Sequence, residues 1–259
     1  MIILQMPSRS SINKETQKNV MYKRKKIIAL VPAYNEEAKI GNVVERMPRD
    51  VVDCVLVIND GSTDGTAQAA EKKGALVLHS PVHRGIGAAL RMGIEHALRN
   101  RYDIIVFVAG NNKDEPKQIV DLVRPIVDEN FDIVMGSRYL PGGHAGNMPA
   151  YRHLATMLHP LIFSIFVGKR LTESTNGFRA FKAQMVLDKR INISQKWLDE
   201  YELEPYLLFK AIKLGYSHTE VPVIKKYPAK ELGYTKMKPF IGWWSILRPI
   251  LLLGLGIKE

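Results

Sequence analysis

Residues Arg101–Pro116, RYDIIVFVAGNNKDEP, decide the fold that we predict for this chain. The β-branched apolar run Ile104–Val108 is typical of a strand that is buried on both faces of a sheet. The polar stretch from Ala109 to Asn112 ends this strand, and Lys113 begins a helical pattern with acids at its start. Ligands of open parallel sheets bind at the carboxyl ends of the strands, so we expect the chemistry at this loop.

Three similar units precede this stretch. Each begins with a short apolar run, Ile27–Val31, Cys54–Ile58 or Ala75–Leu78, which a polar turn and a helical pattern follow. After the central loop the pattern predicts a helix over Lys117–Glu129, a strand over Asp132–Met135, a core or interfacial helix within Tyr151–Leu171, strands over Phe178–Phe181 and Thr219–Ile224, and a helix over Leu198–Leu214. Strands and helices that alternate at this length imply an α/β fold with a mostly parallel sheet and right-handed crossovers.

The composition fits one cytosolic domain. A length of 259 residues and a hydrophobic fraction of 46% suit one large α/β domain, and no linker or internal repeat marks a second one. The single cysteine, Cys54, lies within an apolar run, so neither disulfides nor a zinc site are predicted. Residues Met1–Met6 lack the charged start and the cleavage pattern of a secretory signal, and we therefore expect a cytoplasmic protein.

The net charge of +11 lies at the two ends of the chain. Residues 1–26 contain seven Lys or Arg and one acid, and residues 225–259 contain seven and two, while the charges between them cancel. This distribution favours contact with an anionic membrane surface over a basic groove for nucleic acid. The alternative is that the tails are basic only for solubility.

We therefore predict three segments along the chain. Residues 1–26 form a disordered basic arm, residues 27–239 form the α/β domain, and residues 240–259 form an amphipathic apolar segment. The last segment contains Trp243, Trp244 and a run of leucines, which is typical of short helices that lie in a bilayer interface. A helix that binds a partner or belongs to the core is the alternative for it.

Four motifs occur in order along the chain: PAYNE at Pro32–Glu36, NDGSTDGT at Asn59–Thr66, GSR at Gly136–Arg138 and NGFR at Asn176–Arg179. Together they resemble the family 2 glycosyltransferases of the GT-A fold, and among these the dolichyl- or polyprenyl-phosphate sugar transferases. The resemblance covers roughly residues 26–240. It implies a Rossmann-like nucleotide-binding sheet flanked by helices. It also implies an enzyme that transfers sugar, with inversion, from a nucleotide-sugar to a polyprenyl phosphate at the cytosolic face of a membrane.

The resemblance implies a donor site at the ends of the first strands and in the central loop. Its nucleotide-binding residues would be Pro32, Ala33, Tyr34, Glu36, Asn59, Asp60, Arg84, Gly110 and Asn111. Carboxylates can accept hydrogen bonds from a base or a ribose, and Arg84 at a helix N-terminus can contact the diphosphate. Asn59 replaces the first acid of a pair of aspartates, so it keeps an acceptor oxygen but lacks the charge. For Asn35 and Glu36 the alternative role is to cap the next helix.

The resemblance also implies an acceptor site. Arg138, Arg152 and Thr156 would hold the lipid phosphate, because guanidinium groups suit a phosphate dianion and a hydroxyl can complete its shell. For each arginine the alternative is an ordinary surface ion pair. An ionised phosphate is itself the nucleophile and needs no strong base. Glu204 would contact the acceptor or the sugar, or would be a partner of the helix dipole.

The central loop departs from the family. The family usually has Asp-x-Asp and a glutamine, which hold a divalent ion on the donor diphosphate, but this chain has Ala109, Asn111 and Lys113. A divalent metal is therefore not expected at the usual site, and Asn111, Asp114 and Glu115 are weak candidate ligands. We predict instead that Lys113 provides the cation.

Two further functions stay open at this point. The loss of both aspartates favours a catalytically inactive, glycosyltransferase-like protein that binds a nucleotide-sugar or a membrane partner. A soluble transferase that acts on a hydroxyl acceptor is the other possibility, and Glu204 would be its base.

Overall fold

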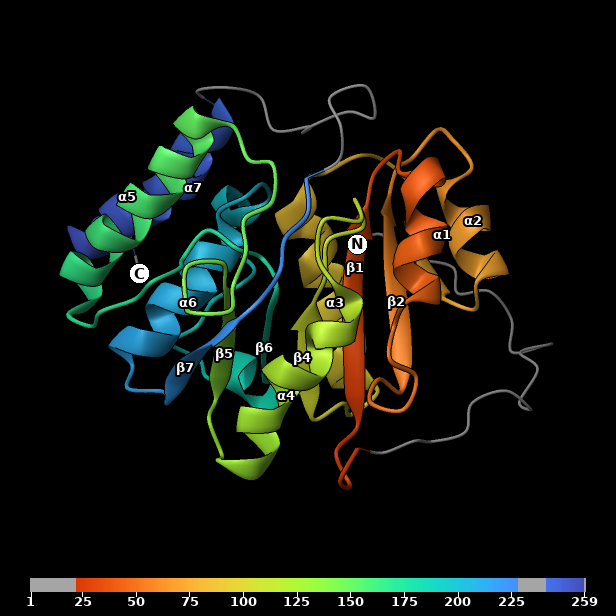
Figure 1. Cartoon of the computed structure of the whole chain (residues 1–259), viewed down its shortest axis with the longest axis horizontal. Helices are drawn as coiled ribbons and strands as arrows, with labels where there is room; N and C mark the ends of the chain where they lie inside the picture. Colours follow the sequence, from red (N-terminus) through yellow and green to blue (C-terminus); the bar gives the residue numbers. More distant parts are fainter. Residues whose placement is uncertain (1–21, 228–240, 259) are drawn as a thin grey trace, which may run out of the picture.

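The computed structural model describes residues 22–227 and 241–258, which fold around one seven-stranded sheet (Figure 1). The order of the strands in the sheet is β3-β2-β1-β4-β6-β5-β7. The strands are β1 (Ile27–Ala33), β2 (Cys54–Asp60), β3 (Leu76–Ser80), β4 (Ile104–Phe107), β5 (Ile133–Ser137), β6 (Arg179–Lys182) and β7 (His218–Pro222). The α-helices are α1 (Glu37–Glu45), α2 (Thr66–Lys72), α3 (Ile86–Arg99), α4 (Ile119–Asp128), α5 (Ala150–Val167), α6 (Leu203–Lys213) and α7 (Ile241–Gly254). Short 3₁₀ turns cover Pro116–Gln118, Ala183–Leu187 and Lys196–Leu198.

The sheet is mostly parallel, as predicted. Strand β1 lies between β2 and β4 and runs parallel to both, so that Leu30 pairs with Leu56 on one side and with Phe107 on the other. Strand β6 is the exception, because it runs antiparallel to both of its neighbours, β4 and β5. The carboxyl ends of β1, β2 and β4 therefore meet at one edge of the sheet, where the predicted donor residues follow them.

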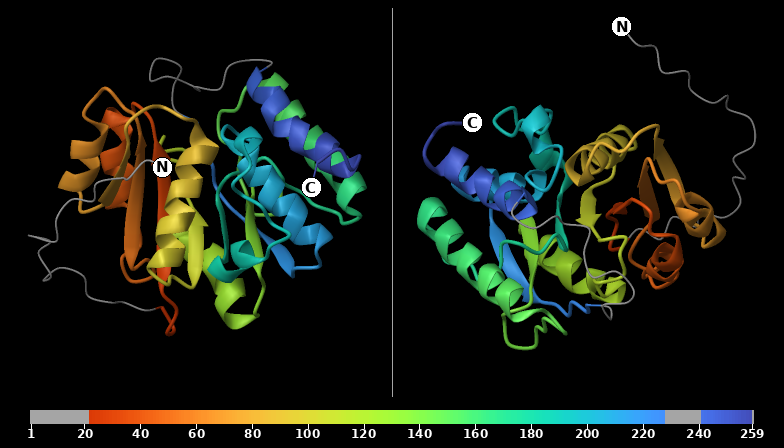
Figure 2. Two further views of the ribbon diagram at one scale, coloured as in Figure 1. Left: turned by 180° about the vertical axis from the view of Figure 1, so that it is seen from behind. Right: turned by 90° about the horizontal axis from the view of Figure 1, so that it is seen from above.

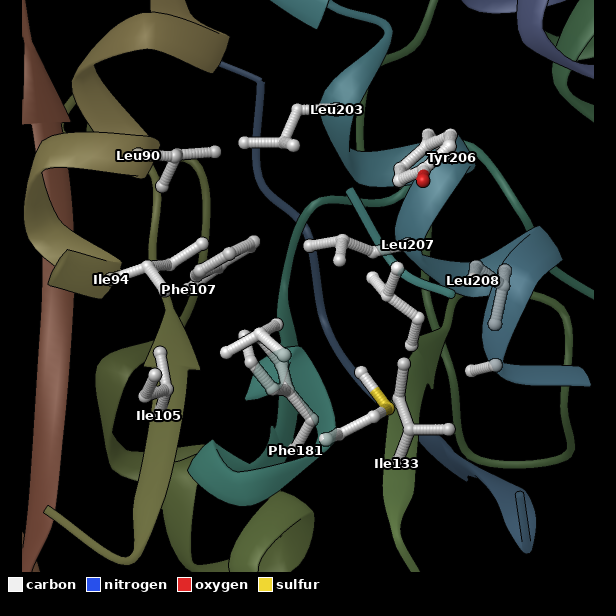
Figure 3. Close-up of a cluster of buried hydrophobic side chains, with 14 of the residues drawn as sticks. Leu90, Ile94, Ile105, Phe107, Ile133, Phe181, Leu203, Tyr206, Leu207 and Leu208 are labelled. Carbon is white, nitrogen blue, oxygen red and sulfur yellow. The ribbon is translucent and has the colours of Figure 1, made fainter. Parts of the chain in front are cut away.

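The side chains of β1 alternate between two hydrophobic cores. Ile28 and Leu30 belong to the core that α3, α5, α6 and α7 cover, and Figure 3 shows part of it around Phe107 and Phe181. Ile27 and Ala29 belong to the core on the opposite face, which α1, α2 and α4 cover. A strand that is apolar on both faces is the pattern expected for the middle of a covered parallel sheet.

Helix α5 ends and helix α6 begins at residues with special backbone requirements. Gly168 follows α5 with a positive φ of 72°, and the helix therefore ends at Val167 rather than at the predicted Leu171. Helix α6 begins at Leu203 rather than at the predicted Leu198. Pro205 then lies in its first turn, where backbone N–H groups have no partner within the helix and proline is tolerated. Likewise, the predicted helix over Lys117–Glu129 starts with a 3₁₀ turn at Pro116.

Helices α5 and α7 lie side by side at the end of the molecule that is remote from α1 and α2 (Figures 1 and 2). Helix α7 also packs on α6, and it buries Ile250 and Leu253, while Trp244 is exposed. The predicted apolar segment thus forms one helix over its described part, with one face in the core. Neither this helix nor any other in the described part of the chain is long and apolar enough to cross a bilayer. Most of the predicted basic arm, residues 1–21, lies outside the described residues.

Candidate active site

The loops after β1 and β2 are joined by hydrogen bonds. The backbone N–H of Asn35 donates to Ser62 Oγ at 2.9 Å, and the side chain of Asn35 accepts from the N–H of Thr63 at 2.8 Å. Asn35 adopts a positive φ of 49°, which asparagine tolerates better than most residues. Asn59 Oδ1 accepts from the N–H of Ser62 at 3.0 Å, so the amide that replaces an aspartate holds the turn after β2.

Asp60 is buried and holds the loop after β3. Its two carboxylate oxygens accept hydrogen bonds from the backbone N–H groups of Arg84 and Gly85, each at 2.9 Å. His83 Nδ1 lies 2.7 Å from Asp60 Oδ2, and the imidazole stacks on the ring of Tyr34 with 3.9 Å between ring centroids. The structure thus brings together Tyr34, Asp60 and Arg84 of the predicted donor site, and His83 lies among them.

Glu36 occupies the N-cap position of α1, but its side chain makes no capping hydrogen bond. Its carboxylate pairs with Lys39 at 3.0 Å, and its backbone N–H donates to Thr66 Oγ1 at 2.8 Å. The alternative that Glu36 serves as a side-chain cap is therefore wrong. Gly110 lies against the same strand end, because a Cβ at this position would come within 2.8 Å of the carbonyl oxygen of Pro32. The central loop can approach β1 this closely only with glycine.

The acids of the central loop are engaged in ion pairs. Asp114 is buried, and its Oδ1 lies 2.5 Å from Lys225 Nζ, while its Oδ2 accepts from the N–H of Ala109 at 2.9 Å. Glu115 pairs with Arg46 and, at 3.5 Å, with Lys226. A carboxylate that binds a metal must direct a lone pair at the ion. Both of these carboxylates instead form ion pairs with lysine or arginine side chains.

This loop therefore does not suit a divalent ion. The side chain of Asn111 accepts from the backbone N–H of Lys113 at 3.2 Å, and Ala109 has no ligand atom. Across residues 22–227 and 241–258, no group of three or more His, Cys, Asp or Glu side chains could hold a metal. Lys113 would in addition repel a divalent cation.

The side chain of Lys113 lies within electrostatic reach of Glu36, which follows β1, and of Arg152 in α5. Its side chain is buried, and its Nζ lies 5.3 Å from the ring centroid of Tyr227. Burial, together with the positive charges of Arg152 and Lys225, lowers the pKa of Lys113 to about 7, although Glu36 opposes this shift. An anion bound beside these cations would favour the charged lysine.

Arg152, near the N-terminus of α5, faces the same tyrosine. Its guanidinium carbon lies 5.5 Å from the ring centroid of Tyr227, and its side chain is half-buried. One aromatic ring therefore connects the lysine of the central loop with an arginine of α5. Thr156, one turn later, is buried, and its hydroxyl lies 2.5 Å from the hydroxyl of Tyr139 and donates to the carbonyl of Arg152 at 2.9 Å.

Arg138 is buried deeper than Arg152. Its Nε donates to Glu173 at 2.6 Å, and its two terminal nitrogens donate to Tyr227 Oη at 2.9 Å and to Thr175 Oγ1 at 2.7 Å. Burial is the largest single influence and acts to lower the pKa of Arg138, but the combined effect of Glu173, Tyr227 and Tyr139 raises this pKa above its ordinary value. The surface ion pair that we considered for Arg138 is instead a buried one, with 2% of the side chain exposed.

Glu204 belongs to a buried polar cluster behind this site. A Cβ on Gly177 would lie 2.2 Å from Glu204 Oε1, so the turn before β6 touches the carboxylate directly. Burial raises the pKa of Glu204, and the charges of Arg179 and Lys225 oppose this shift. Lys225 Nζ also donates to Asn176 Oδ1 at 2.8 Å, which links the cluster to the central loop.

Sequence reasoning missed the residues that follow β7. Lys225 and Tyr227 lie in a segment without a motif, yet they contact the central loop and both predicted arginines. The only signal for them was the run of two lysines and a tyrosine directly after a strand end. His83 directly precedes Arg84, which the family resemblance places in the donor site, but the contact of His83 with Asp60 could not be predicted from spacing.

Comparison with known proteins gives the family. The model of glycosyl transferase family 2 matches residues 28–193. Undecaprenyl-phosphate mannosyltransferase of Micrococcus luteus is 31% identical over 219 residues, which cover 82% of this chain and 87% of that protein. Polyprenol monophosphomannose synthase of Mycolicibacterium smegmatis is 29% identical over 217 residues, which cover 81% of this chain and 80% of that protein.

A solved structure shares the fold. Glucosyl-3-phosphoglycerate synthase from Mycobacterium tuberculosis, in complex with Mn²⁺, uridine diphosphate and glucosyl-3-phosphoglycerate, superposes with a TM-score of 0.67 at 22% identity. The match covers 93% of this chain and 84% of that one, and the predicted GT-A fold is thereby confirmed. Because the family model spans most of the α/β domain and a relative above 30% identity covers most of the chain, this protein belongs to glycosyl transferase family 2.

Proposed function

We propose that this protein transfers a sugar from a nucleotide-sugar to a polyprenyl phosphate, with inversion, at the cytosolic face of a membrane. The observation that carries the proposal is the ring of Tyr227, over which Lys113 from the central loop and Arg152 from α5 both lie. Two phosphate-binding cations from the two halves of the domain thus converge on one place. The names of the mannosyltransferase and synthase relatives support a lipid phosphate as the acceptor.

The reaction at this site needs no strong base. An oxygen of the acceptor phosphate attacks the anomeric carbon of the sugar, and the bond from that carbon to the diphosphate oxygen breaks, so that the nucleoside diphosphate leaves. Attack on the face opposite to the leaving group inverts the anomeric configuration. The acceptor phosphate is already ionised, and the site therefore has to bind charge rather than remove a proton.

Lys113 would stabilise the charge that develops on the diphosphate. Relatives in the fold bind Mn²⁺ or Mg²⁺ with uridine diphosphate, but the central loop of this chain does not offer ligands for such an ion. A sheltered ammonium group that is already in place can stabilise the leaving group without reorganisation. Arg84, which is exposed at the N-terminus of α3, would contribute a second charge.

We assign different roles to the two arginines. Arg152 is half-buried and would contact the acceptor phosphate directly. Arg138 is buried, with its donors directed at Glu173, Thr175 and Tyr227, and it would position the tyrosine ring that Arg152 and Lys113 share. Thr156 would act in the same indirect way, by holding Tyr139 against the start of α5.

Helix α5 would place this site at a membrane surface. Its outward face exposes an apolar stripe of six residues, each at least 48% accessible: Tyr151, Leu154, Met157, Leu158, Leu161 and Ile165. Neither α5 nor α7 contains an acid, and the exposed Lys169 and Arg170 follow α5 directly. An apolar face with basic ends suits the interface of an anionic bilayer, and Arg152 at the start of α5 would then lie near the lipid headgroups.

Transfer of labelled sugar from a panel of nucleotide-sugars to a short polyprenyl phosphate tests the proposal. Arg152→Ala should lower kcat/KM roughly tens- to hundredfold, because a charged contact to the phosphate is lost, while nucleotide binding should stay nearly unchanged. Arg99→Ala, an exposed arginine at the end of α3, is the matched control. Loss of nucleotide affinity in Arg152→Ala would instead assign this arginine to the donor site.

A second function is favoured by the ion pairs of the central loop. Asp114 and Glu115 form ion pairs with basic side chains of the protein itself. A homologue that binds a nucleotide-sugar without catalysis would show the same ion pairs. Nucleotide-sugar binding together with a complete lack of transfer, across the panel and with added Mg²⁺ or Mn²⁺, would support that function.

A further inference from the structure

The side chain of His83 lies where the proposed donor site would receive a base. Its imidazole is stacked on Tyr34, with 3.9 Å between ring centroids and an interplanar angle of 11°. Its Nδ1 lies 2.7 Å from Asp60 Oδ2. Tyr34 and Asp60 are the two residues of this site best suited to recognise a base, one by stacking and the other by accepting an N–H.

The imidazole thus makes the same two kinds of contact that a nucleobase would make. It is a flat, nitrogen-containing ring, it stacks on the phenol, and it presents a ring nitrogen to the carboxylate. A stacking distance of 3.9 Å leaves no space for another ring between His83 and Tyr34. A base that stacks on this face of Tyr34 must therefore displace the imidazole.

The backbone of this loop is held by hydrogen bonds and by close packing. The N–H groups of Arg84 and Gly85 are held by Asp60, and a Cβ on Gly61 would lie 2.4 Å from the backbone nitrogen of His83. The loop is thus fixed against the turn after β2. The His83 side chain, in contrast, is 46% exposed, so it can rotate toward solvent.

We infer that His83 occupies the base position in the free protein and lowers the affinity for the donor, which binds only after the imidazole rotates away from Tyr34 and Asp60. This inference rests on the proposed donor site. A ligand that binds only the open form has its apparent affinity reduced by the fraction of molecules that are open. Removal of the imidazole should therefore strengthen nucleotide binding, which is the opposite of what a residue that contacts the base would show.

Titration calorimetry with adenosine, guanosine, cytidine and uridine diphosphates tests this inference. The diphosphate that binds the wild type best should bind His83→Ala about three- to tenfold more tightly, the range expected when a competing hydrogen bond and stacking contact are removed. His83→Asn, whose amide can donate to Asp60 but cannot stack in the same way, should give an intermediate affinity. His79→Ala, an exposed histidine on β3, should bind like the wild type.

The imidazole resonances provide a second measurement. The carbon-bound protons of His83 should lose the ring-current shift of Tyr34 when the diphosphate is added. Equal or weaker binding by His83→Ala, or unchanged His83 resonances on saturation, would overturn the inference and leave the donor site standing. If no diphosphate binds the wild type or any variant, the donor site itself is wrong, and the inference falls with it.

Discussion

Asp114 and Lys225 form a buried ion pair, with 2.5 Å between Oδ1 and Nζ. The same carboxylate accepts the N–H of Ala109, and the backbones of Asp114 and Lys225 form an antiparallel bridge. The central loop, in which Ala109, Asn111 and Lys113 stand at the positions of the family's metal-binding motif, is therefore held by an ion pair within the protein.

The first prediction concerns this ion pair. Asp114→Ala should lower the free energy of unfolding by roughly 3–5 kcal/mol, because it leaves Lys225 charged and buried without its partner. Urea unfolding measures this loss. Glu45→Ala breaks the exposed pair with Lys73 and should change stability by less than about 1 kcal/mol. Equal effects of the two substitutions would contradict the structural role of the Asp114 pair.

The second prediction concerns pH. The pKa of Lys113 is about 7 in the folded protein and 10.5 for an ordinary lysine, so between these values the unfolded chain binds more protons than the folded one. Stability should therefore rise as the pH increases from about 7 toward 10, relative to Lys113→Met. Urea unfolding of both proteins at several pH values checks the sign. A wild type that loses stability relative to the variant over this range would contradict the placement of Lys113 among cations.

The third prediction concerns the apolar stripe of α5. Leu161→Glu and Ile165→Glu should weaken sedimentation with anionic vesicles about tenfold or more, because each puts a charge on the face that would enter the interface. Both side chains are exposed, so the fold should persist. Leu187→Glu is the matched control, since Leu187 is 64% exposed but lies outside α5. Equal sedimentation of all variants would assign membrane contact to another surface.

The fourth prediction concerns two glycines. Gly87→Ala in α3 should destabilise the protein by about 1–3 kcal/mol, because the new Cβ would clash with the backbone carbonyl oxygens of Leu198 and Glu200, which cannot rotate aside as a side chain could. Gly41→Ala within α1 meets no atom closer than 3.7 Å and should be neutral or stabilising by up to about 1 kcal/mol. Thermal unfolding of both variants gives the comparison. A tolerated Gly87→Ala would show that the backbone around Leu198 can move away from α3.

The sequence predicted the strands well and their directions only in part. A buried run such as Ile104–Val108 identifies a strand because apolar residues on both faces need a covered sheet. The same kind of run at Phe178–Phe181 cannot say that β6 runs antiparallel between β4 and β5, since direction depends on partners far along the chain. The end of α5 and the start of α6 were predicted wrongly, because the effect of Gly168 and of Pro205 on a helix end becomes clear only in the structure.

In the candidate site, too, only residues with a local sequence pattern could be predicted. A motif gave Asp60, the family resemblance gave Arg152, and the departure from the Asp-x-Asp pattern gave Lys113; each of the three lies near a strand end or a helix start. Tyr227 connects Lys113 with both arginines, yet no local pattern marks it, because its position depends on how the segment after β7 crosses the central loop. Arg138 is buried, whereas Arg152 is half-buried. The spacing of fourteen residues between them could not show this difference in burial.

The most direct test of the central claim is sugar transfer to a short polyprenyl phosphate in excess EDTA, for the wild type and Lys113→Ala. The account predicts wild-type transfer that survives EDTA and collapses in the variant, because the ammonium group rather than a divalent ion would stabilise the leaving diphosphate. Arg99→Ala, with its exposed side chain at the end of α3, should behave like the wild type. Transfer that depends strictly on added Mg²⁺ or Mn²⁺ and is unaffected by Lys113→Ala would contradict the account.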